Sequence, residues 1–356
     1  MLQSVLESKF GHAVSLKNFT IMALKPGAGN PTSLGVYRVS GEAEVQGSLS
    51  NFSVVVKHLA DGKPFMDASA PEGWNYWRRE TAFFESPLAA RIPSAVGFPA
   101  YLGETVLADG SALFWNGDLG NLEKSVWTWD DCLTASALVA EVNSVKSDDL
   151  GEYPWLNRSQ VEGWAELHRV WNTFESNLPT LLDIIHSSER LADSAFAGYL
   201  DRYGYIAEVL STGRHSFVHG DFNLNNLVPA KGDSPMIALD WQLCGEARIG
   251  TEVAAIYNTA IEHKVTSPTS ESFEQLCEVY TNRFNELNPA NPISIDEVRL
   301  AAAAMGYFIM VNMPLFFMNF PPPENEDERR ERLSQMATSF FEGAVEVYAK
   351  VLKSLE

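Results

Sequence analysis

The sequence predicts an α+β fold, with a sheet-rich first third followed by a mostly helical remainder. Residues 35–58 consist of short runs rich in β-branched side chains and separated by turn residues, which is typical of paired strands. After residue 130, apolar side chains recur at the spacing of amphipathic helices. The 356 residues, 46% of them hydrophobic, suffice for a packed core in two domains or one large one.

The first third is interpreted as a hairpin followed by one helix. The runs GVYRVSGEAEVQ and NFSVVVKHL are separated by GSLS, whose glycine and serines favour a turn, so residues 35–58 should pair antiparallel. Residues 72–90 have helical spacing, and the prolines and glycine of RIPSAVGFP end that helix. A short strand at SALFW then leads into the connection NGDLGN.

The remainder is expected to be helical over residues 130–146, 159–186, 192–212, most of 251–320, and 326–355. Residues 301–320 carry no charge over a length that could span a bilayer. Pro314, Asn312 and Asn319 weaken a membrane span, and we expect a buried core helix there. A membrane-anchored protein is the alternative.

Charge and cysteine usage narrow the function classes. The formal net charge of −20 argues against a nucleic-acid partner, because such proteins bring lysine and arginine to phosphates, and it suits cationic small molecules. Three widely spaced cysteines without a CxxC pair predict free thiols in a reducing compartment: Cys132, Cys244 and Cys277. The segment MLQSVLESKFGH lacks the basic start and apolar run of a signal peptide, so we expect a cytoplasmic protein.

A polar loop between two apolar runs carries the strongest functional signal. The stretch FVHGDFNLNNLV, residues 217–228, contains one aspartate and three asparagines: Asp221, Asn223, Asn225 and Asn226. Because these residue types are also ordinary in turns, the motif alone has low specificity. His219 is expected to be a packed, hydrogen-bonded anchor of the loop and not an acid or base.

A second hairpin is predicted to bring another carboxylate to this loop. Residues 227–228 and 236–239, joined by the turn AKGDSP, should pair antiparallel and place Asn226 beside Asp240. One amide and one carboxylate oxygen suit Mg²⁺, which takes phosphate oxygens as further ligands. Asp221 can then orient a hydroxyl nucleophile, so the loop is interpreted as a phosphoryl-transfer site.

Two charges in the first third support this interpretation. Lys57 ends the apolar run FSVVVK, so its ammonium group should emerge from a buried surface and need an anionic partner. Glu80 lies on the apolar stripe of the expected helix and is the natural partner. A lysine so placed can contact nucleotide phosphates, although an exposed strand-end lysine is the alternative. The solvated side of the helix should hold Arg78, Arg79 and Glu85.

The order of these parts, at positions 57, 80, 219–226 and 240, matches the order of parts in kinases. On H-G-D-x-x-x-x-N and ALDWQ, the sequence resembles the aminoglycoside phosphotransferase and choline kinase superfamily of small-molecule kinases. The resemblance covers most of the chain and is strongest over 217–254. It implies a bilobal protein-kinase-like fold, with a nucleotide-binding N-lobe (1–117) that has a small antiparallel sheet and one helix. A large, mostly helical C-lobe (118–356) would hold the catalytic loop, metal site and acceptor pocket.

The resemblance also implies the roles of individual residues. It implies Asp221 as the catalytic base, Asn226 and Asp240 as magnesium ligands, Lys57 as the phosphate contact and Glu80 as its partner. The connection FWNGD between the lobes would offer backbone groups to adenine, from Trp115, Asn116 and Gly117. ATP is the expected phosphoryl donor, with GTP left open, and the protein would be a monomer or homodimer.

Three departures from the family pattern stand out. Glu252, in GTEVA, replaces a common aspartate and is expected to brace the catalytic loop, and Asn223 replaces a second histidine. KPGAGNPTSLG is not a recognisable GxGxxG phosphate loop. These departures keep a second class open, a nucleotide-binding pseudoenzyme without transfer activity.

The acceptor is expected to be a small molecule with a hydroxyl group. An aminoglycoside or other antibiotic is the first candidate, and a metabolite such as choline, an amino alcohol, homoserine or a sugar is the alternative. Aromatic and acidic residues of the helical half could hold an amine or a sugar: VWTWDD, DDLGEYPW, Trp164 and Trp171. Asp130 and Asp131 also lie where a helix would begin, and capping explains them better than a ligand does.

Overall fold

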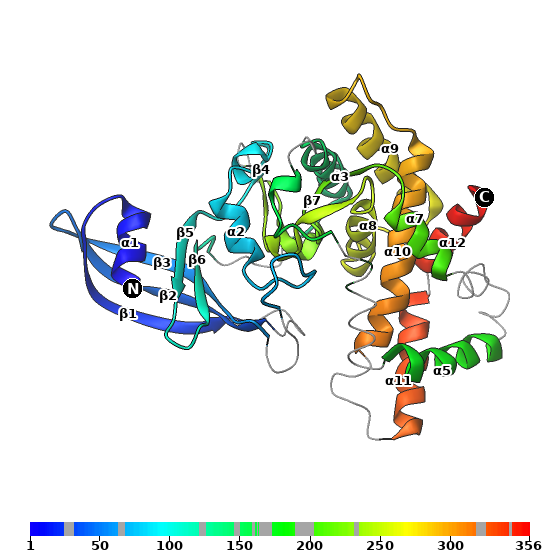
Figure 1. Ribbon diagram of the computed structural model, residues 1–356, viewed down its shortest axis with the longest axis horizontal. Helices are drawn as coiled ribbons and strands as arrows, with labels where there is room; N and C mark the ends of the chain where they lie inside the picture. The colour runs from blue at the N-terminus through cyan, green and yellow to red at the C-terminus, as the bar shows by residue number, and fades with distance from the viewer. Residues whose placement is uncertain are drawn as a thin grey trace.

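The chain folds into a smaller lobe built on a β-sheet and a larger, mostly helical lobe (Figure 1). The computed structural model describes residues 1–24, 32–62, 68–120, 126–145, 150–158, 161, 163, 173–188, 203–230, 235–317, 325–341 and 344–356. The predicted α+β architecture is therefore present. Residue 117 ends a strand of the smaller lobe, and the domain boundary expected there stays a prediction.

The smaller lobe contains a five-stranded antiparallel sheet in the order β1-β2-β3-β6-β5. Its strands are β1 (Val14–Leu24), β2 (Ser33–Val45), β3 (Ser48–Leu59), β5 (Tyr101–Val106) and β6 (Ala112–Gly117). The predicted hairpin is β2–β3, and its tight turn falls at Gln46 and Gly47, which both have positive φ. Strands β1 and β5 were not expected.

Helices lie on both faces of this sheet. Helix α1 (Leu2–Phe10) buries Val5 and Leu6 against one face, while α2 (Arg79–Glu85) lies between the other face and the larger lobe (Figure 1). The expected helix 72–90 is thus shorter than predicted. Pro87 disfavours helical backbone at the residue before it, and Ser86 is extended accordingly.

The larger lobe is helical, as predicted, and its helices gather around α10 (Figure 1). Its described helices are α3 (Trp129–Asn143), α5 (Thr173–Ser187), α7 (Tyr203–Ser211), α8 (Val253–Glu262), α9 (Ser270–Leu287), α10 (Ile295–Phe317), α11 (Glu326–Phe341) and α12 (Ala344–Ser354). Gly306 lets α10 and α12 approach closely, since a Cβ there would lie 2.3 Å from the Tyr348 ring.

Helix α10 is a core helix over its described side chains, with residues 301–304, Tyr307 and Phe308 buried. Within the described part of the chain, no helix has the length and apolar character needed to cross a bilayer. All three cysteines are buried free thiols, as predicted.

Short strands and turns position the loop at 219–226. Strand β7 (His215–Val218) pairs antiparallel with β10 (Gly245–Arg248), and β9 (Met236–Ala238) pairs with β8 (Leu227–Val228) and, in parallel, with β4 (Val96–Gly97). Single 3₁₀ turns complete the fold: η1 (Ala89–Arg91), η2 (Leu150–Glu152), η3 (Leu224–Asn226) and η4 (Trp241–Leu243). The loop therefore leaves β7 and enters β8.

Candidate active site

The carboxylate of Asp221 lies at the centre of the loop between β7 and β8. Asn223 Nδ2 donates a hydrogen bond of 2.6 Å to one carboxylate oxygen, and Asn226 Nδ2 donates one of 2.6 Å to the other. Burial raises the pKa of Asp221 to about 7, and the negative charge of Asp240 adds to the rise. The two amides thus fix the orientation of a carboxylate whose affinity for a proton is high for an aspartate.

The buried side chain of His219 holds this loop in place, as the sequence predicts. Its side chain is fully buried; Nε2 lies 3.0 Å from the Leu239 carbonyl, and Nδ1 accepts a hydrogen bond from the Asp221 amide at 3.2 Å. The ring also packs against Trp241, with 4.4 Å between centroids. Burial lowers the pKa of His219 to about 4, which keeps the imidazole neutral near pH 7.

Glu252 braces the start of the loop, as expected from its position. One carboxylate oxygen accepts a hydrogen bond of 2.8 Å from the Gly220 amide, and the other accepts one of 3.0 Å from Asn143 Nδ2. Gly220 has a φ of 86°, and a Cβ there would lie 2.2 Å from the Leu243 carbonyl oxygen. Only glycine fits this close approach, so the loop's path is determined locally.

The hairpin that was predicted to carry the second carboxylate is present, with its register shifted by one residue. Leu227 pairs with Ala238, so Asn226 faces Leu239, whose amide donates to the Asn226 carbonyl at 2.8 Å. Asp240 is one residue further and has left-handed backbone, φ 62° and ψ 65°. This conformation is uncommon outside glycine, although asparagine and aspartate adopt it more readily than other residues.

Lys57 and Glu80 form the predicted ion pair, 2.6 Å between Nζ and Oε2, and Glu80 is 2% exposed. Lys57 also contacts Asp240 at 2.9 Å, so one ammonium group joins carboxylates from the two lobes. Burial would lower the pKa of Lys57, but the charges of Asp240 and Glu80 outweigh it and raise the pKa. Glu80 in turn accepts a hydrogen bond from the Trp241 amide at 3.3 Å.

Arg79 corrects the sequence analysis, which placed it on the solvated side of its helix. Its side chain is fully buried, and the guanidinium donates to four backbone carbonyls, those of Gly73, Trp74, Trp155 and Gln242. Burial lowers its pKa to about 10. Arg79 therefore ties α2 to segments of the larger lobe.

The residues expected to offer backbone groups to adenine lie within β6, between β3 and β5. Asn116 is paired with Val55 on one side and Tyr101 on the other, and the Gly117 amide donates to the Ala100 carbonyl at 2.8 Å. The Trp115 side chain is buried in the core on the α1 side. The expectation that these residues offer backbone groups to adenine stays a prediction.

One of the acidic residues considered for the acceptor, Asp131, has a structural role at the start of α3. Thr128 and Asp131 form a capping box, in which Thr128 Oγ1 accepts from the Asp131 amide and the Asp131 carboxylate accepts from the Thr128 amide. Capping thus explains Asp131, as the sequence analysis favoured. Residues 146–149, Trp164, Trp171 and most of the expected phosphate loop at 25–31 lie outside the described residues.

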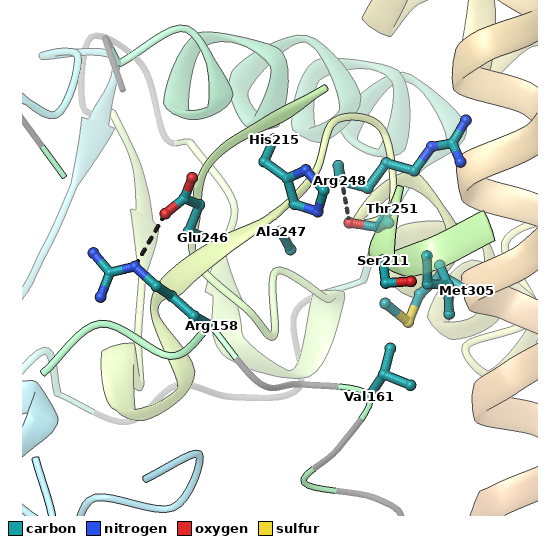
Figure 2. Close-up of a pocket in the computed structure, with 10 residues that line it drawn as sticks. Arg158, Val161, Ser211, His215, Glu246, Ala247, Arg248, Thr251 and Met305 are labelled. Carbon is teal, nitrogen blue, oxygen red and sulfur yellow. Dashed lines mark hydrogen bonds and ion pairs between the residues drawn. The ribbon is translucent and has the colours of Figure 1, made fainter. Parts of the chain in front are cut away.

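A cavity of about 190 Å³ lined by both polar and apolar residues lies at the other end of the β7–β10 ribbon (Figure 2). His215 and Arg248 pair there, while the loop at 219–226 leaves the ribbon beyond Val218. Arg158, which forms an ion pair of 3.1 Å with Glu246, lines the cavity on one side. No residue predicted for phosphoryl transfer lines it, and the long side chain of Arg248 points away from the other lining groups (Figure 2).

The arrangement can be compared with known proteins. No protein-family model matches the chain, and no curated protein matches its sequence. Among solved structures, the GDP complex of aminoglycoside 2′-phosphotransferase-IIIa has 13% identity and a TM-score of 0.52, covering 95% of this chain and 98% of that one. Spectinomycin phosphotransferase with ADP and spectinomycin has 11% identity and a TM-score of 0.52, covering 99% and 97%.

A third solved structure is amicoumacin kinase in complex with AMP-PNP and Ca²⁺, with 11% identity and a TM-score of 0.50, covering 90% of this chain and 87% of that one. The chain has the bilobal fold of these small-molecule kinases. The fold class that the motif order predicts is thereby confirmed. At this level of identity the similarity concerns the fold, and the function has to be argued from the site.

Proposed function

We propose that the protein is a phosphotransferase that moves the γ-phosphoryl group of a nucleoside triphosphate to a hydroxyl group of a small molecule. The observation that carries the proposal is the meeting of Lys57, Glu80 and Asp240 across the two lobes at 2.6 and 2.9 Å. A partly buried cation held between carboxylates, next to an oriented aspartate, is an arrangement that suits phosphoryl transfer.

Each residue has a role that follows from its contacts. Lys57 neutralises the charge of the triphosphate, and Glu80 keeps its ammonium group in place from a fully buried position. Asp221, fixed by the amides of Asn223 and Asn226, orients the acceptor hydroxyl and takes up its proton. Catalysis then rests on positioning and charge neutralisation.

The donor set fits a magnesium ion that arrives with the nucleotide. The Asn226 amide nitrogen is used in bonds to Asp221, so its oxygen is the atom left for a cation, and the Asp240 side chain is 48% exposed. The described residues include no group of three or more His, Cys, Asp or Glu that could hold a metal. Mg²⁺ commonly uses one or two protein ligands together with substrate phosphates, and there it would polarise the triphosphate.

The acceptor is a hydroxylated small molecule, and an aminoglycoside or other antibiotic is the first class to test. One solved structure with this fold contains spectinomycin bound to its own phosphotransferase, and another is an amicoumacin kinase. The net charge of −20 favours a cationic acceptor, which also suits an amino alcohol or other metabolite. Asn223 and Glu252 are the departures from the family pattern that left a pseudoenzyme as an alternative. Asn223 donates a hydrogen bond to Asp221 within the loop, and Glu252 accepts one from the Gly220 amide of the same loop, so both support the loop's structure.

The test replaces the residue that should orient the acceptor. Asp221→Ala is expected to lower the transfer rate by a factor of about 10² to 10⁴, while nucleotide affinity stays close to that of the parent. Transfer from ATP is measured on a panel of aminoglycosides, other antibiotics and amino alcohols, and nucleotide affinity by calorimetry. Asp296→Ala, an exposed aspartate at the start of α10, serves as the control. An Asp221→Ala variant with parental activity would refute the assignment.

A further inference from the structure

Asn116 is a buried amide whose oxygen has no hydrogen-bond donor. The residue is 6% exposed, and its Oδ1 is one of the few buried side-chain polar atoms without a partner among the described residues. A buried acceptor left without a donor destabilises the folded chain, and native proteins rarely keep one without a reason. The missing donor can be supplied by a ligand.

The strand register places this amide on the same face of the sheet as Lys57. Lys57 pairs with Phe114, and its Nζ lies 5.9 Å from the centroid of that ring. Asn116 pairs with Val55, two residues further along both strands. Since side chains alternate between the faces of a strand, Phe114 and Asn116 share the Lys57 face, while Trp115 lies on the other face.

The positions of Lys57 and Asn116 on this face of the sheet predict how a nucleotide would lie along it. Its phosphates belong at Lys57, which contacts Asp240 of the larger lobe. Asn116 is about 7 Å further along β6, given the rise of two strand residues, and lies next to the chain that leaves for the larger lobe. That chain is held by Asp118, whose carboxylate contacts Arg38 at 2.8 Å and accepts from Ser53. A nucleotide with phosphates at Lys57 therefore has its base beside Val55 and Asn116.

This inference rests on the proposed function. We propose that the Asn116 side chain reads the base, with Oδ1 accepting a hydrogen bond from the 6-amino group of adenine, and that the protein uses ATP in preference to GTP. Adenine presents a donor at position 6, whereas guanine presents a carbonyl oxygen there. Two acceptors would then face each other, with Asn116 largely buried, which is a strong source of discrimination.

Rotation of the amide would reverse this preference. It would present Nδ2 in place of Oδ1 and would favour the 6-carbonyl of guanine. The orientation in the structure, with Oδ1 as the buried atom lacking a donor, argues for the 6-amino purine. The two orientations give opposite rankings of ATP and GTP, so a binding experiment separates them.

The first experiment uses the parent protein and three nucleotides that differ on the base. Calorimetry in the presence of Mg²⁺ compares ATP, GTP and purine riboside 5′-triphosphate, which lacks the 6-amino group. ATP should bind about tenfold more tightly than the purine riboside nucleotide, the range of one hydrogen bond, and at least as much more tightly than GTP. Equal affinities, or tighter GTP binding, would overturn the inference and leave the proposed function standing. No binding of any of the three would overturn both.

The second experiment removes the acceptor. Asn116→Leu keeps similar volume, and it should erase the advantage of ATP over the purine riboside nucleotide while affinity for the latter changes less than about twofold. A purely structural role would weaken all three nucleotides alike. Leu113→Ala, on the opposite face of β6, is the control and should keep the parental ratio. Asn116→Ala, which also removes the acceptor, is the second variant if Asn116→Leu does not fold. A parental ratio of the affinities for ATP and the purine riboside nucleotide in either variant would contradict the assignment.

Discussion

At the scale of single residues, Glu252 combines a buried carboxylate with a structural task. Its oxygens accept hydrogen bonds from the Gly220 amide and Asn143 Nδ2, and Tyr280 donates to the same asparagine at 2.6 Å. Burial outweighs these bonds and raises the pKa of Glu252 to about 7. The folded chain therefore holds a proton at Glu252 more tightly than the unfolded chain does.

The raised pKa predicts a pH dependence of stability. The stabilisation from the protonated form of Glu252 is complete below pH 4.5 and is lost as the pH rises to about 7, a change of about 3 kcal/mol at most. Urea unfolding of the parent and of Glu252→Gln between pH 5 and pH 8 should show a smaller decline in the variant. Groups such as His219 titrate in both proteins, so the difference reports Glu252 together with its effect on Asp221, whose pKa the Glu252 charge also raises. Identical pH profiles would contradict the raised pKa.

At the scale of elements, both aromatic stacking and hydrogen bonds attach α2 to the larger lobe. Phe83 stacks on Trp241 with ring centroids 4.4 Å apart, Gln242 Nε2 donates to the Tyr76 carbonyl at 2.6 Å, and Arg79 donates to carbonyls on both sides. These contacts hold Glu80 beside Trp241, the residue that follows Asp240. The geometry of the Lys57 ion pairs thus depends on the attachment of one short helix.

Removing the Arg79 guanidinium should therefore be costly. Arg79→Leu leaves buried carbonyls without donors, and we expect it to destabilise the chain by about 3 kcal/mol or more. Arg330, which pairs with Asp183 on the surface at 2.5 Å, is the control, and Arg330→Leu should stay within about 0.5 kcal/mol of the parent. Urea unfolding of both variants measures the difference. Equal effects would mean that the buried contacts of Arg79 contribute little to stability.

Arg79 also shows where sequence patterns stop being informative. Glu80 could be paired with Lys57 from the sequence because both interrupt apolar runs and carry opposite charges. Arg79 is satisfied by backbone carbonyls, which leave no trace in side-chain identity, so a charged residue there resembles a solvated one. Strand β1 was missed for a related reason: it lies at the sheet edge with most side chains exposed, and burial imposes no alternation on it.

At the scale of the whole molecule, the resemblance to small-molecule kinases implied the two-lobed fold, and the sequence paired Lys57 with Glu80. The contact of Lys57 with Asp240 was not predicted. The larger lobe was predictable because its helices are long and periodic. The face of β6 on which each side chain lies was not predictable, because strand register decides it. The sequence analysis gave Asn116 a backbone role, and the register places its side chain on the Lys57 face.

A ligand that bridges the lobes should stabilise the molecule as a unit. Lys57 and Asp240 come from different lobes and contact each other at 2.9 Å, so the triphosphate with its magnesium would engage both. At 100 times its dissociation constant, Mg-ATP should add about 2.7 kcal/mol and raise the melting temperature by a few degrees.

Asp240→Asn is the variant that tests this link. Asparagine tolerates the left-handed backbone at position 240, so the change removes a charge without adding strain. The melt without ligand should change little, because the pair is partly exposed and Lys57 keeps Glu80 as a partner. The Mg-ATP shift should be largely lost, and ATP without magnesium should give the parent a smaller shift than Mg-ATP does. A full shift in Asp240→Asn would mean that the nucleotide binds without this carboxylate, and the metal assignment at position 240 would be wrong.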